Sequence, residues 1–362
     1  MTSLHDTLTL ARGPAWRNRF MLAPLTNSQS HDDGTLSDEE FRWLTKRAEG
    51  GFGLVMTCAS HVQAAGRGFP GQLGCFSDQH LPGLARLAAE IRKHGAVSSV
   101  QLHHAGIRSP EKLIGQQPVG PSDHADTKSR ALTLDEVKHL RDDFIAAAVR
   151  AEKAGFDGVE LHGAHSYILC AFLSPETNQR TDAYGGSPEN RARIVHEIID
   201  GIRSHTRADF QLGVRLSPER FGLVTTEMMA LAEGLMTGGR IDYLDMSLWD
   251  VFKEPEDPAL KGRPLMSLFT ELKRGNTRLG AAGKIVTGEH AADRLKHGLD
   301  FVVIGRSAIL HHDWPRRIAA DPQARPAALP VTAQHLRDEG LSDTFVTYMR
   351  NWKGFVAEEA AA

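Results

Sequence analysis

The stretch from Leu134 to Tyr167, LDEVKHLRDDFIAAAVRAEKAGFDGVELHGAHSY, contains one helix-and-strand unit of the chain. In its first part, Leu134 to Ala154, apolar residues recur at helical spacing on one face, and charged residues occupy the other faces. A short apolar run, Gly155 to His162, follows and ends among polar residues. This order predicts an outer helix followed by a buried strand, which is the repeating unit of a parallel sheet.

Seven further runs have the same strand-like composition, and helical segments separate them. The eight predicted strands are Asn18 to Pro24, Gly53 to Ser60, Ala96 to His103, Gly155 to His162, Asp209 to Leu216, Ile241 to Ser247, Lys284 to Gly288 and Asp300 to Gly305. Eight parallel strands close a TIM barrel. We therefore expect an α/β fold, one TIM-barrel domain over residues 1–362 with its core at about 18–310.

Start signals mark several of the expected helices. Ser37 with Glu40 and Thr133 with Glu136 have the spacing of capping boxes, and Ser187 precedes a proline at a first helical position. Two segments do not fit a minimal barrel: the loop 105–132 and the tail 311–362. Long irregular loops often cover a site, so we expect 105–132 to be a lid near the active face.

The composition excludes several classes of protein. With 41% hydrophobic and 24% charged residues and a net charge of -3, the chain is globular and lacks the basic excess of a general nucleic-acid binder. No apolar stretch approaches the about 20 residues that span a bilayer. Three cysteines are too few for a disulfide framework or an iron-sulfur cluster. We expect a cytoplasmic enzyme with a small-molecule substrate and no nucleic-acid or membrane partner.

In such a barrel the chemistry belongs to the carboxyl ends of the strands. Near the last two ends, Gly288, Gly305 and Arg306 could hold a phosphate group, although structural turns would have the same sequence. Arg215 and Gln101, at two other ends, suit the edge of a planar heterocycle such as a flavin. A structural salt bridge for Arg215 and a loop hydrogen bond for Gln101 are the alternatives.

At the end of the fourth predicted strand, His162, His165 and Tyr167 lie close together in sequence. The two histidines could be structural, could bind a metal, or could donate hydrogen bonds to a carbonyl oxygen that gains negative charge during reduction. In the last case, Tyr167 is a suitable proton donor.

These residues resemble the old yellow enzyme family of FMN-dependent NAD(P)H oxidoreductases. The resemblance covers nearly the whole chain and rests on Arg19 to Thr26 (RFMLAPLT), Gln101 to Gly106 (QLHHAG) and Gly305-Arg306. Its most specific part is His162 to Arg193, which reads HGAHSYILCAFLSPETNQRTDAYGGSPENRAR.

The resemblance implies non-covalently bound FMN, reduced by NADH or NADPH. The residues implied to line the flavin ring are Pro24, Leu25, Thr26, Ala59, Gln101 and Arg215. Those implied to hold its phosphate are Ser247, Gly288, Gly305 and Arg306. His162 and His165 then bind the substrate oxygen, and Tyr167 protonates the alkene carbon opposite the hydride. The implied reaction is ping-pong reduction of α,β-unsaturated carbonyl or nitro compounds.

The tail segment Tyr348 to Trp352 resembles the Tyr-x-Arg-x-Trp ending of the bacterial, YqjM-like branch. This implies a homodimer or higher oligomer in which Arg350 binds substrate in a neighbouring site; a solvated terminal helix is the alternative. The chain departs from that branch at Thr26, where the branch has Cys, and at Ser28, where it has Tyr. Thr26 matches the plant and yeast branch instead.

Two other functions remain open at this point. Some relatives within the family oxidise or demethylate small amines, although many of these are longer and carry an iron-sulfur cluster. A metal-dependent barrel hydrolase could instead use His103, His104, His162 and His165 as ligands.

Overall fold

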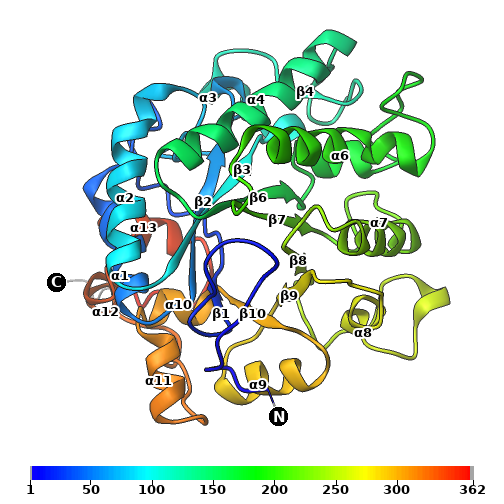
Figure 1. Ribbon diagram of the computed structural model, residues 1–362. Helices are drawn as coiled ribbons and strands as arrows, with labels where there is room; N and C mark the ends of the chain where they lie inside the picture. The colour runs from blue at the N-terminus through cyan, green and yellow to red at the C-terminus, as the bar shows by residue number, and fades with distance from the viewer. Residues whose placement is uncertain (1, 359–362) are drawn as a thin grey trace.

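The computed structural model, which describes residues 2–358, contains a closed barrel of eight parallel strands (Figure 1). The strands are β1 Phe20–Leu22, β2 Leu54–His61, β3 Val97–His103, β6 Gly158–Gly163, β7 Gln211–Leu216, β8 Tyr243–Ser247, β9 Arg278–Ala282 and β10 Phe301–Ile304. Around the barrel they follow the order β1-β10-β9-β8-β7-β6-β3-β2, so neighbours in the barrel are also neighbours in the chain. The predicted TIM barrel is confirmed.

Helices surround the barrel (Figure 1). The longer ones are α1 Asp38–Glu49, α2 Leu81–Lys93, α4 Leu134–Lys153, α6 Pro188–His205, α7 Thr225–Thr237 and α9 Gly288–Lys296. Shorter helical segments are η1 Ala64–Gly66, η2 Asp78–His80, α5 Ile168–Leu173, η4 Pro258–Leu260, α8 Leu265–Thr270 and α10 Arg306–Leu310. The apolar face predicted for α4, with Val137, Leu140 and Phe144, is buried.

One predicted strand is wrong. Residues Lys284 to Thr287 form a loop, Gly288 begins α9, and the strand lies earlier, at β9. The β9 segment RLGAA has little apolar bulk, because a large side chain has no room there: a Cβ on Gly280 would lie 2.1 Å from the ring of Phe301. The apolar pair Ile285-Val286 therefore gave a stronger strand signal than the true strand did.

The helix starts agree with the sequence in two of three cases. Thr133 and Glu136 form a full capping box, and Ser187 caps α6 ahead of Pro188. At α1 only half of the predicted box is present. Ser37 accepts a hydrogen bond from the Glu40 backbone amide at 3.1 Å, but the Glu40 side chain is buried and accepts hydrogen bonds from Asn27 and Ser30 instead.

The N-terminal end of the barrel is filled by apolar packing. Trp16, from the segment that precedes β1, packs edge-on against Tyr243 at 5.4 Å and Phe301 at 4.9 Å between ring centroids. Its indole N–H donates to Gln211 Oε1 at 3.1 Å. These partners begin β8, β10 and β7, so Trp16 closes the end at which the strands start.

Nearer the carboxyl ends, one side of the barrel interior is polar. Gln101 on β3, Glu160 on β6, Arg215 on β7 and Asp245 on β8 are all buried. They are adjacent in the barrel, because Gln101 pairs with Glu160 across β3 and β6, and Arg215 pairs with Asp245 across β7 and β8. We call these four residues the polar strip; it lies beneath the face where function is expected.

The loop 105–132 and the tail contain short elements. The loop holds η3 Gly106–Arg108, α3 Glu111–Ile114, β4 Val119–Gly120 and β5 Arg130–Ala131. The tail holds α11 Trp314–Ala320, α12 Ala333–Asp338 and α13 Asp343–Met349. Phe345 of α13 packs edge-on against Trp43 of α1 at 4.9 Å, which fixes the tail to the barrel wall.

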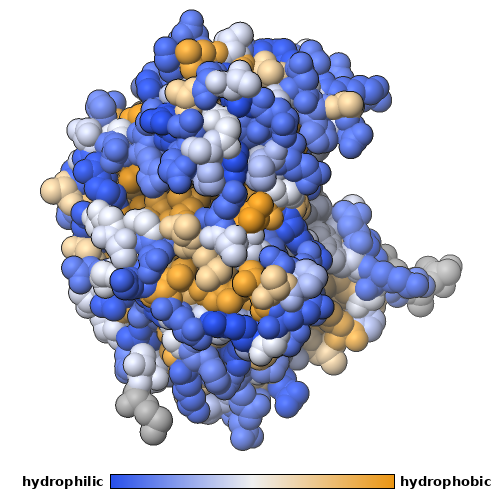
Figure 2. Space-filling model, turned by 90° about the vertical axis from the view of Figure 1, so that its right-hand side faces the viewer, coloured by the Kyte–Doolittle hydropathy of each residue, from blue (hydrophilic) through white to orange (hydrophobic). Residues whose placement is uncertain are grey.

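Within residues 2–358, no helix is long and apolar enough to cross a membrane. The side of the molecule that carries α7 and α8 has hydrophobic side chains gathered at its centre, with hydrophilic ones around them (Figure 2). Helix α7, on this side, includes the half-buried Met229 and Leu231.

Candidate active site

A cavity of about 990 Å³ opens where the strands end. Ten of the residues predicted to form the site line it: Pro24, Leu25, Thr26, Ala59, Gln101, His162, His165, Tyr167, Arg215 and Arg306. They come from the ends of β1, β2, β3, β6, β7 and β10, or from the loops directly after them. Residues far apart in the chain therefore meet at one face of the barrel.

The turn after β6 has an unusual backbone. His165 and Ser166 both have a φ of 61°, in the left-handed region that residues other than glycine seldom adopt. Two contacts hold the turn: the His165 amide donates to Ser217 Oγ at 3.1 Å, and Arg108 donates to the His165 carbonyl at 2.7 Å. The strained turn is thus fixed from β7 on one side and from the loop 105–132 on the other.

His162 on β6 and His165 in this turn are both neutral near pH 7. Burial, and then the charges of nearby cationic groups, place the pKa of His162 well below its usual range and lower that of His165 to about 3. The Ala164 amide donates to His162 Nδ1 at 3.3 Å, so the proton of that ring resides on Nε2. A neutral imidazole with Nε2–H can donate a hydrogen bond to a ligand oxygen.

Tyr167 lies against the same histidines. Its ring packs edge-on against His103 at 4.3 Å and His162 at 4.9 Å between centroids. The guanidinium carbon of Arg108 lies 4.8 Å from the centre of the Tyr167 ring. The tyrosine is therefore held on three sides while it lines the cavity.

Gln101 and Arg215 form the floor of the cavity on the β3 and β7 side. Gln101 Nε2 donates to Glu160 Oε1 at 2.8 Å, and Arg215 Nε lies 3.0 Å from Asp245 Oδ2. Both residues are anchored from below by a carboxyl group and also line the cavity. This pair presents a cation and an amide to any ligand bound above it.

The residues predicted to hold a phosphate do not all lie in the cavity. Arg306 lines it and is exposed, and Gly305 directly precedes it at the start of α10. Gly288 begins α9 outside the cavity lining, and a Cβ there would lie 2.3 Å from the Pro322 carbonyl. Tight packing therefore already explains the glycine at 288.

Ser247, at the end of β8, lies with the histidine turn. Its hydroxyl is 2.7 Å from His165 Nε2 and accepts a hydrogen bond from Arg215 at 3.4 Å. The hydroxyl therefore orients the His165 ring. Neither Arg306 nor a glycine is among its hydrogen-bonding partners in residues 2–358.

The tail contributes a wall of the cavity that sequence reasoning did not foresee. Tyr348, Met349, Trp352 and Phe355 line it. Burial raises the pKa of Tyr348, and the neighbouring Thr26 opposes this shift. Arg350 is exposed, and its guanidinium donates to the Ala357 carbonyl at 3.4 Å, outside the cavity of its own chain.

Further lining residues had weak sequence signals. Ile107, Arg108, His124, Asp126 and Thr127 belong to the loop expected to be a lid, so the region was identified although the residues were not. Phe221 was not predicted, whereas Trp249 begins a region, Trp249 to Pro264, that was expected to shape the pocket. Their rings lie edge-on to His165 at 6.4 Å and 6.3 Å. Both follow strand ends, and that position was the available signal.

The four histidines of the hydrolase alternative are not arranged to bind a metal. His104 has both ring nitrogens engaged, because Nδ1 accepts from the Gly106 amide at 3.0 Å and Nε2 lies 3.1 Å from Gln63 Oε1. His103 Nδ1 lies 3.0 Å from Gln72 Nε2, an amide nitrogen that can only donate. Together with His162, whose Nδ1 accepts from the Ala164 amide, three of the four rings thus use their lone pairs within the protein.

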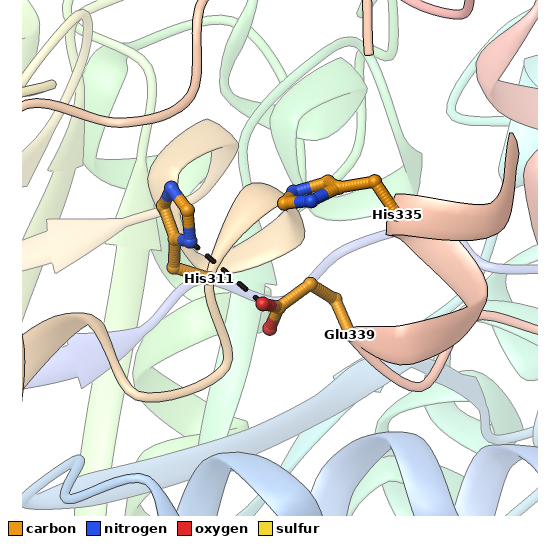
Figure 3. A group of neighbouring side chains, drawn as sticks. All are labelled: His311, His335 and Glu339. Atoms are coloured by element: carbon orange, nitrogen blue, oxygen red, sulfur yellow. Dashed lines mark ion pairs between the residues drawn. The ribbon is translucent and has the colours of Figure 1, made fainter. Parts of the chain in front are cut away.

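A different histidine cluster, His311, His335 and Glu339, lies in the tail (Figure 3). His311 Nδ1 is 3.7 Å from Glu339, and His311 Nε2 accepts a hydrogen bond from the Ala327 amide at 2.9 Å. A ring that accepts at Nε2 carries its proton at Nδ1, so the nitrogen facing Glu339 has no lone pair for a metal. The cluster fastens α12 to the segment after α10 and belongs to the structure of the tail.

Comparisons with known proteins agree with this geometry. A sequence model described as the NADH:flavin oxidoreductase / NADH oxidase family matches residues 14–324. The chain is 37% identical over 326 residues to a protein of Bacillus subtilis (strain 168) described as a probable NADH-dependent flavin oxidoreductase, YqiG, and the match covers 87% of each chain.

Two solved structures have the same fold. The old yellow enzyme homologue from Zymomonas mobilis is 28% identical, with a TM-score of 0.80, and the match covers 95% of this chain and 99% of that one. Morphinone reductase in complex with tetrahydroNAD is also 28% identical, with a TM-score of 0.79 and coverage of 95% and 97%.

Proposed function

Because this chain belongs to the NADH:flavin oxidoreductase / NADH oxidase family, the family of old yellow enzyme, we propose that it reduces C=C bonds activated by a carbonyl or nitro group. It is an FMN-dependent oxidoreductase that takes electrons from NADH or NADPH. One observation carries the proposal: two neutral histidines and a tyrosine line the same cavity as Gln101 and Arg215.

The chemistry of the cavity fits FMN. Gln101 offers an amide and Arg215 a cation to the edge of the flavin ring that carries carbonyl oxygens and an N–H, and Thr26 offers a hydroxyl. Pro24, Leu25 and Ala59 supply apolar contacts for the ring. Gly305 and Arg306 would hold the phosphate. When bound, FMN supplies the relay that accepts a hydride from NAD(P)H and passes it to the alkene.

His162 and His165 bind the oxygen of the alkene substrate. During hydride addition, negative charge develops on this oxygen, and donors placed there beforehand stabilise the transition state. Because the rings are neutral, each donates a hydrogen bond without moving a proton to the oxygen. Ser247 orients the His165 ring through its 2.7 Å contact with Nε2, and we assign it this role in place of phosphate binding.

Tyr167 completes the addition by donating its hydroxyl proton to the α-carbon, while the hydride adds to the β-carbon. Contacts with His103, His162 and Arg108 hold its ring in place. The tyrosine then regains a proton from solvent. Since nicotinamide and the alkene both need access to this same cavity, the two substrates bind in turn, which is a ping-pong mechanism.

The position of Arg350 in the tail supports a contact with a second copy of the chain. Its residues on either side of Arg350 line the cavity, whereas Arg350 is exposed on the outer side of the same turn. An exposed arginine next to the cavity is suitably placed to reach a second copy of the chain. We therefore propose a homo-oligomer in which Arg350 contributes to a neighbouring substrate site.

A direct test is anaerobic turnover by the purified protein. It should release FMN on denaturation and should oxidise NADH or NADPH when cyclohex-2-enone is added, with cyclohexanone as the product. Cyclohexene is the matched control, because it has the same ring and double bond but no activating carbonyl group. A protein that carries FMN yet oxidises neither nucleotide in response to enones or nitroalkenes would contradict the proposed reaction.

A further inference from the structure

The polar strip beneath the cavity contains a carboxyl group that the proposed reaction does not use. Glu160 is fully buried in the barrel, two residues before His162 on β6. Side chains at this spacing on a strand point to the same face, so Glu160 lies one layer below His162. Its Oε1 accepts the hydrogen bond from Gln101 Nε2 at 2.8 Å.

This hydrogen bond fixes which end of the Gln101 amide the cavity receives. An amide side chain has an NH₂ end that donates and an oxygen end that accepts. Glu160 takes the NH₂ end, so the remaining Gln101 oxygen is the end that can accept from a ligand. With Arg215 as the donor, the floor of the cavity offers one acceptor and one donor. This matches a flavin edge on which an N–H lies next to carbonyl oxygens.

The charges around Glu160 favour its protonated form. Asp245 lies in ion-pair contact with Arg215 at 3.0 Å, so the single guanidinium of the polar strip already has an anionic partner. A second buried carboxylate in the strip would have no cation of its own. Burial first, and then the charge of Asp245, raise the pKa of Glu160 to about 8, while Arg215, Gln101 and Tyr243 oppose the shift.

The remaining groups around Glu160 do not reverse this balance. Tyr243 on β8 has a pKa raised chiefly by burial, and so it remains an uncharged phenol. His162, above Glu160 on the same strand, is a neutral imidazole. The second oxygen, Glu160 Oε2, is buried and receives no hydrogen bond of normal geometry from any residue between 2 and 358. The Tyr243 hydroxyl, which likewise has no hydrogen bond of normal geometry within the described residues, is the neighbouring group that can share a proton with this oxygen.

We propose that Glu160 is a positioning residue for FMN: in its protonated form it fixes the Gln101 amide and leaves Arg215 and Asp245 as a neutral pair below the flavin. The inference rests on the proposed contacts of Gln101 and Arg215 with FMN. Loss of the Glu160 proton adds a negative charge beside Asp245 and weakens the attraction of Arg215 for the carbonyl oxygens of the flavin. FMN is therefore held less tightly as the pH rises through about 8.

The test measures FMN release, which does not depend on alkene turnover. Holoenzyme is diluted at pH values from 6 to 9.5, and the fluorescence of free FMN gives its dissociation constant. For the unchanged chain, this constant should be level between pH 6 and 7 and rise by about fivefold by pH 9.5. Glu160→Gln keeps the acceptor for Gln101 and cannot ionise. Its constant at pH 7 should stay within about twofold of the unchanged value and should not rise with pH.

Two further variants separate positioning from general structure. Glu160→Leu removes the acceptor, so Gln101 loses its fixed orientation and the FMN dissociation constant should increase by about tenfold or more. Asp157→Asn is the matched control: Asp157 is a buried carboxyl just before the same strand, hydrogen-bonded to the Ser98 amide at 2.9 Å at the opposite end. This variant should keep the pH dependence of the unchanged chain.

The inference is overturned if Glu160→Gln keeps that pH dependence, if Asp157→Asn loses it, or if folded Glu160→Leu binds FMN as tightly as the unchanged chain. A chain that binds no FMN at any pH would contradict the proposed function itself. If the chain binds FMN but the pH dependence of binding is the same with and without Glu160, only the positioning role is contradicted.

Discussion

The two ends of the barrel differ in whether residues other than glycine adopt left-handed backbone. At the N-terminal end, the turns that lead into strands place glycine at positive φ: Gly51, Gly95, Gly155, Gly239, Gly275 and Gly298. Within residues 2–358, the other residue types at positive φ all lie in segments that follow a strand: Ser28, Lys128, His165, Ser166, Arg220, Phe221, Trp249 and Lys284. Four of these eight line the cavity: His165, Ser166, Phe221 and Trp249.

Buried charges show the same contrast. Asp242, just before β8 at the N-terminal end, is fully buried, and Arg12 donates to it at 3.1 Å, Arg203 at 2.6 Å and the Leu212 amide at 2.8 Å. Asp245, three residues later on the cavity side, has one cationic partner, Arg215, in a contact of poor hydrogen-bonding geometry.

This difference shows where the molecule is optimised for stability and where for binding. At one end, strain is avoided and each polar group of Asp242 is paired. At the other end, strained turns line the cavity, and an incompletely paired buried carboxyl group lies beneath it. Variants at matched positions should therefore change stability at one end and function at the other.

The largest effect on stability is expected at Asp242. Replacing it with asparagine removes the anion between Arg12 and Arg203 and leaves buried positive charge without a partner. The free energy of unfolding should fall by about 3–5 kcal/mol, as measured by urea denaturation. The FMN content of the folded fraction should be unchanged. Loss of FMN without loss of stability would contradict the division between the two ends.

A smaller loss is expected for Gly155→Ala at the N-terminal end. Gly155 has a φ of 87°, and the nearest atom that a Cβ would meet is Arg92 Nη2 at 3.8 Å. There is room for the methyl group, so the cost is backbone strain alone, about 1–2 kcal/mol of unfolding free energy. Thermal unfolding measures it, and a variant as stable as the unchanged chain would show that this position is not strained for alanine.

The smallest effect should have the opposite sign. Ser166→Gly places glycine at a φ of 61° on the cavity side and should stabilise the fold by up to about 1 kcal/mol, since relief of strain exceeds the added freedom of the unfolded chain. Alkene reduction should slow, because the turn that holds His165 and Tyr167 becomes mobile. If the variant is more stable but its turnover is unchanged, the backbone strain at this turn is not needed for activity.

Much of the fold could be predicted because the barrel strands are apolar and short, with polar residues at their ends. Seven of the eight predicted strands overlap observed ones. The failure at β9 has a physical reason. Glycine is required at position 280 because the Phe301 ring of the neighbouring strand occupies the space of a side chain there. No local sequence pattern indicates this contact. Glu40 shows the same limit, because its partners Asn27 and Ser30 come from the loop after β1.

The site could be predicted only in part. Residues at strand ends, such as Gln101 and His162, were identified because their position in a barrel implies their location. The roles of Ser247 and Glu160 depend on contacts between strands, and sequence spacing does not show such contacts. The aromatic wall of the tail was missed because Tyr348 and Trp352 reach the cavity only through the packing of α13 on α1.

If Tyr167 is the proton donor in the proposed alkene reduction, its hydroxyl group should matter in only one of the two half-reactions. Anaerobic stopped-flow absorbance of Tyr167→Phe measures the two half-reactions separately. Reduction of bound FMN by NAD(P)H should keep about its original rate, whereas reoxidation by cyclohex-2-enone should slow by about 10²-fold or more. If both half-reactions slow equally, or if reoxidation keeps its rate, Tyr167 is not the donor and the assignment of the site is wrong.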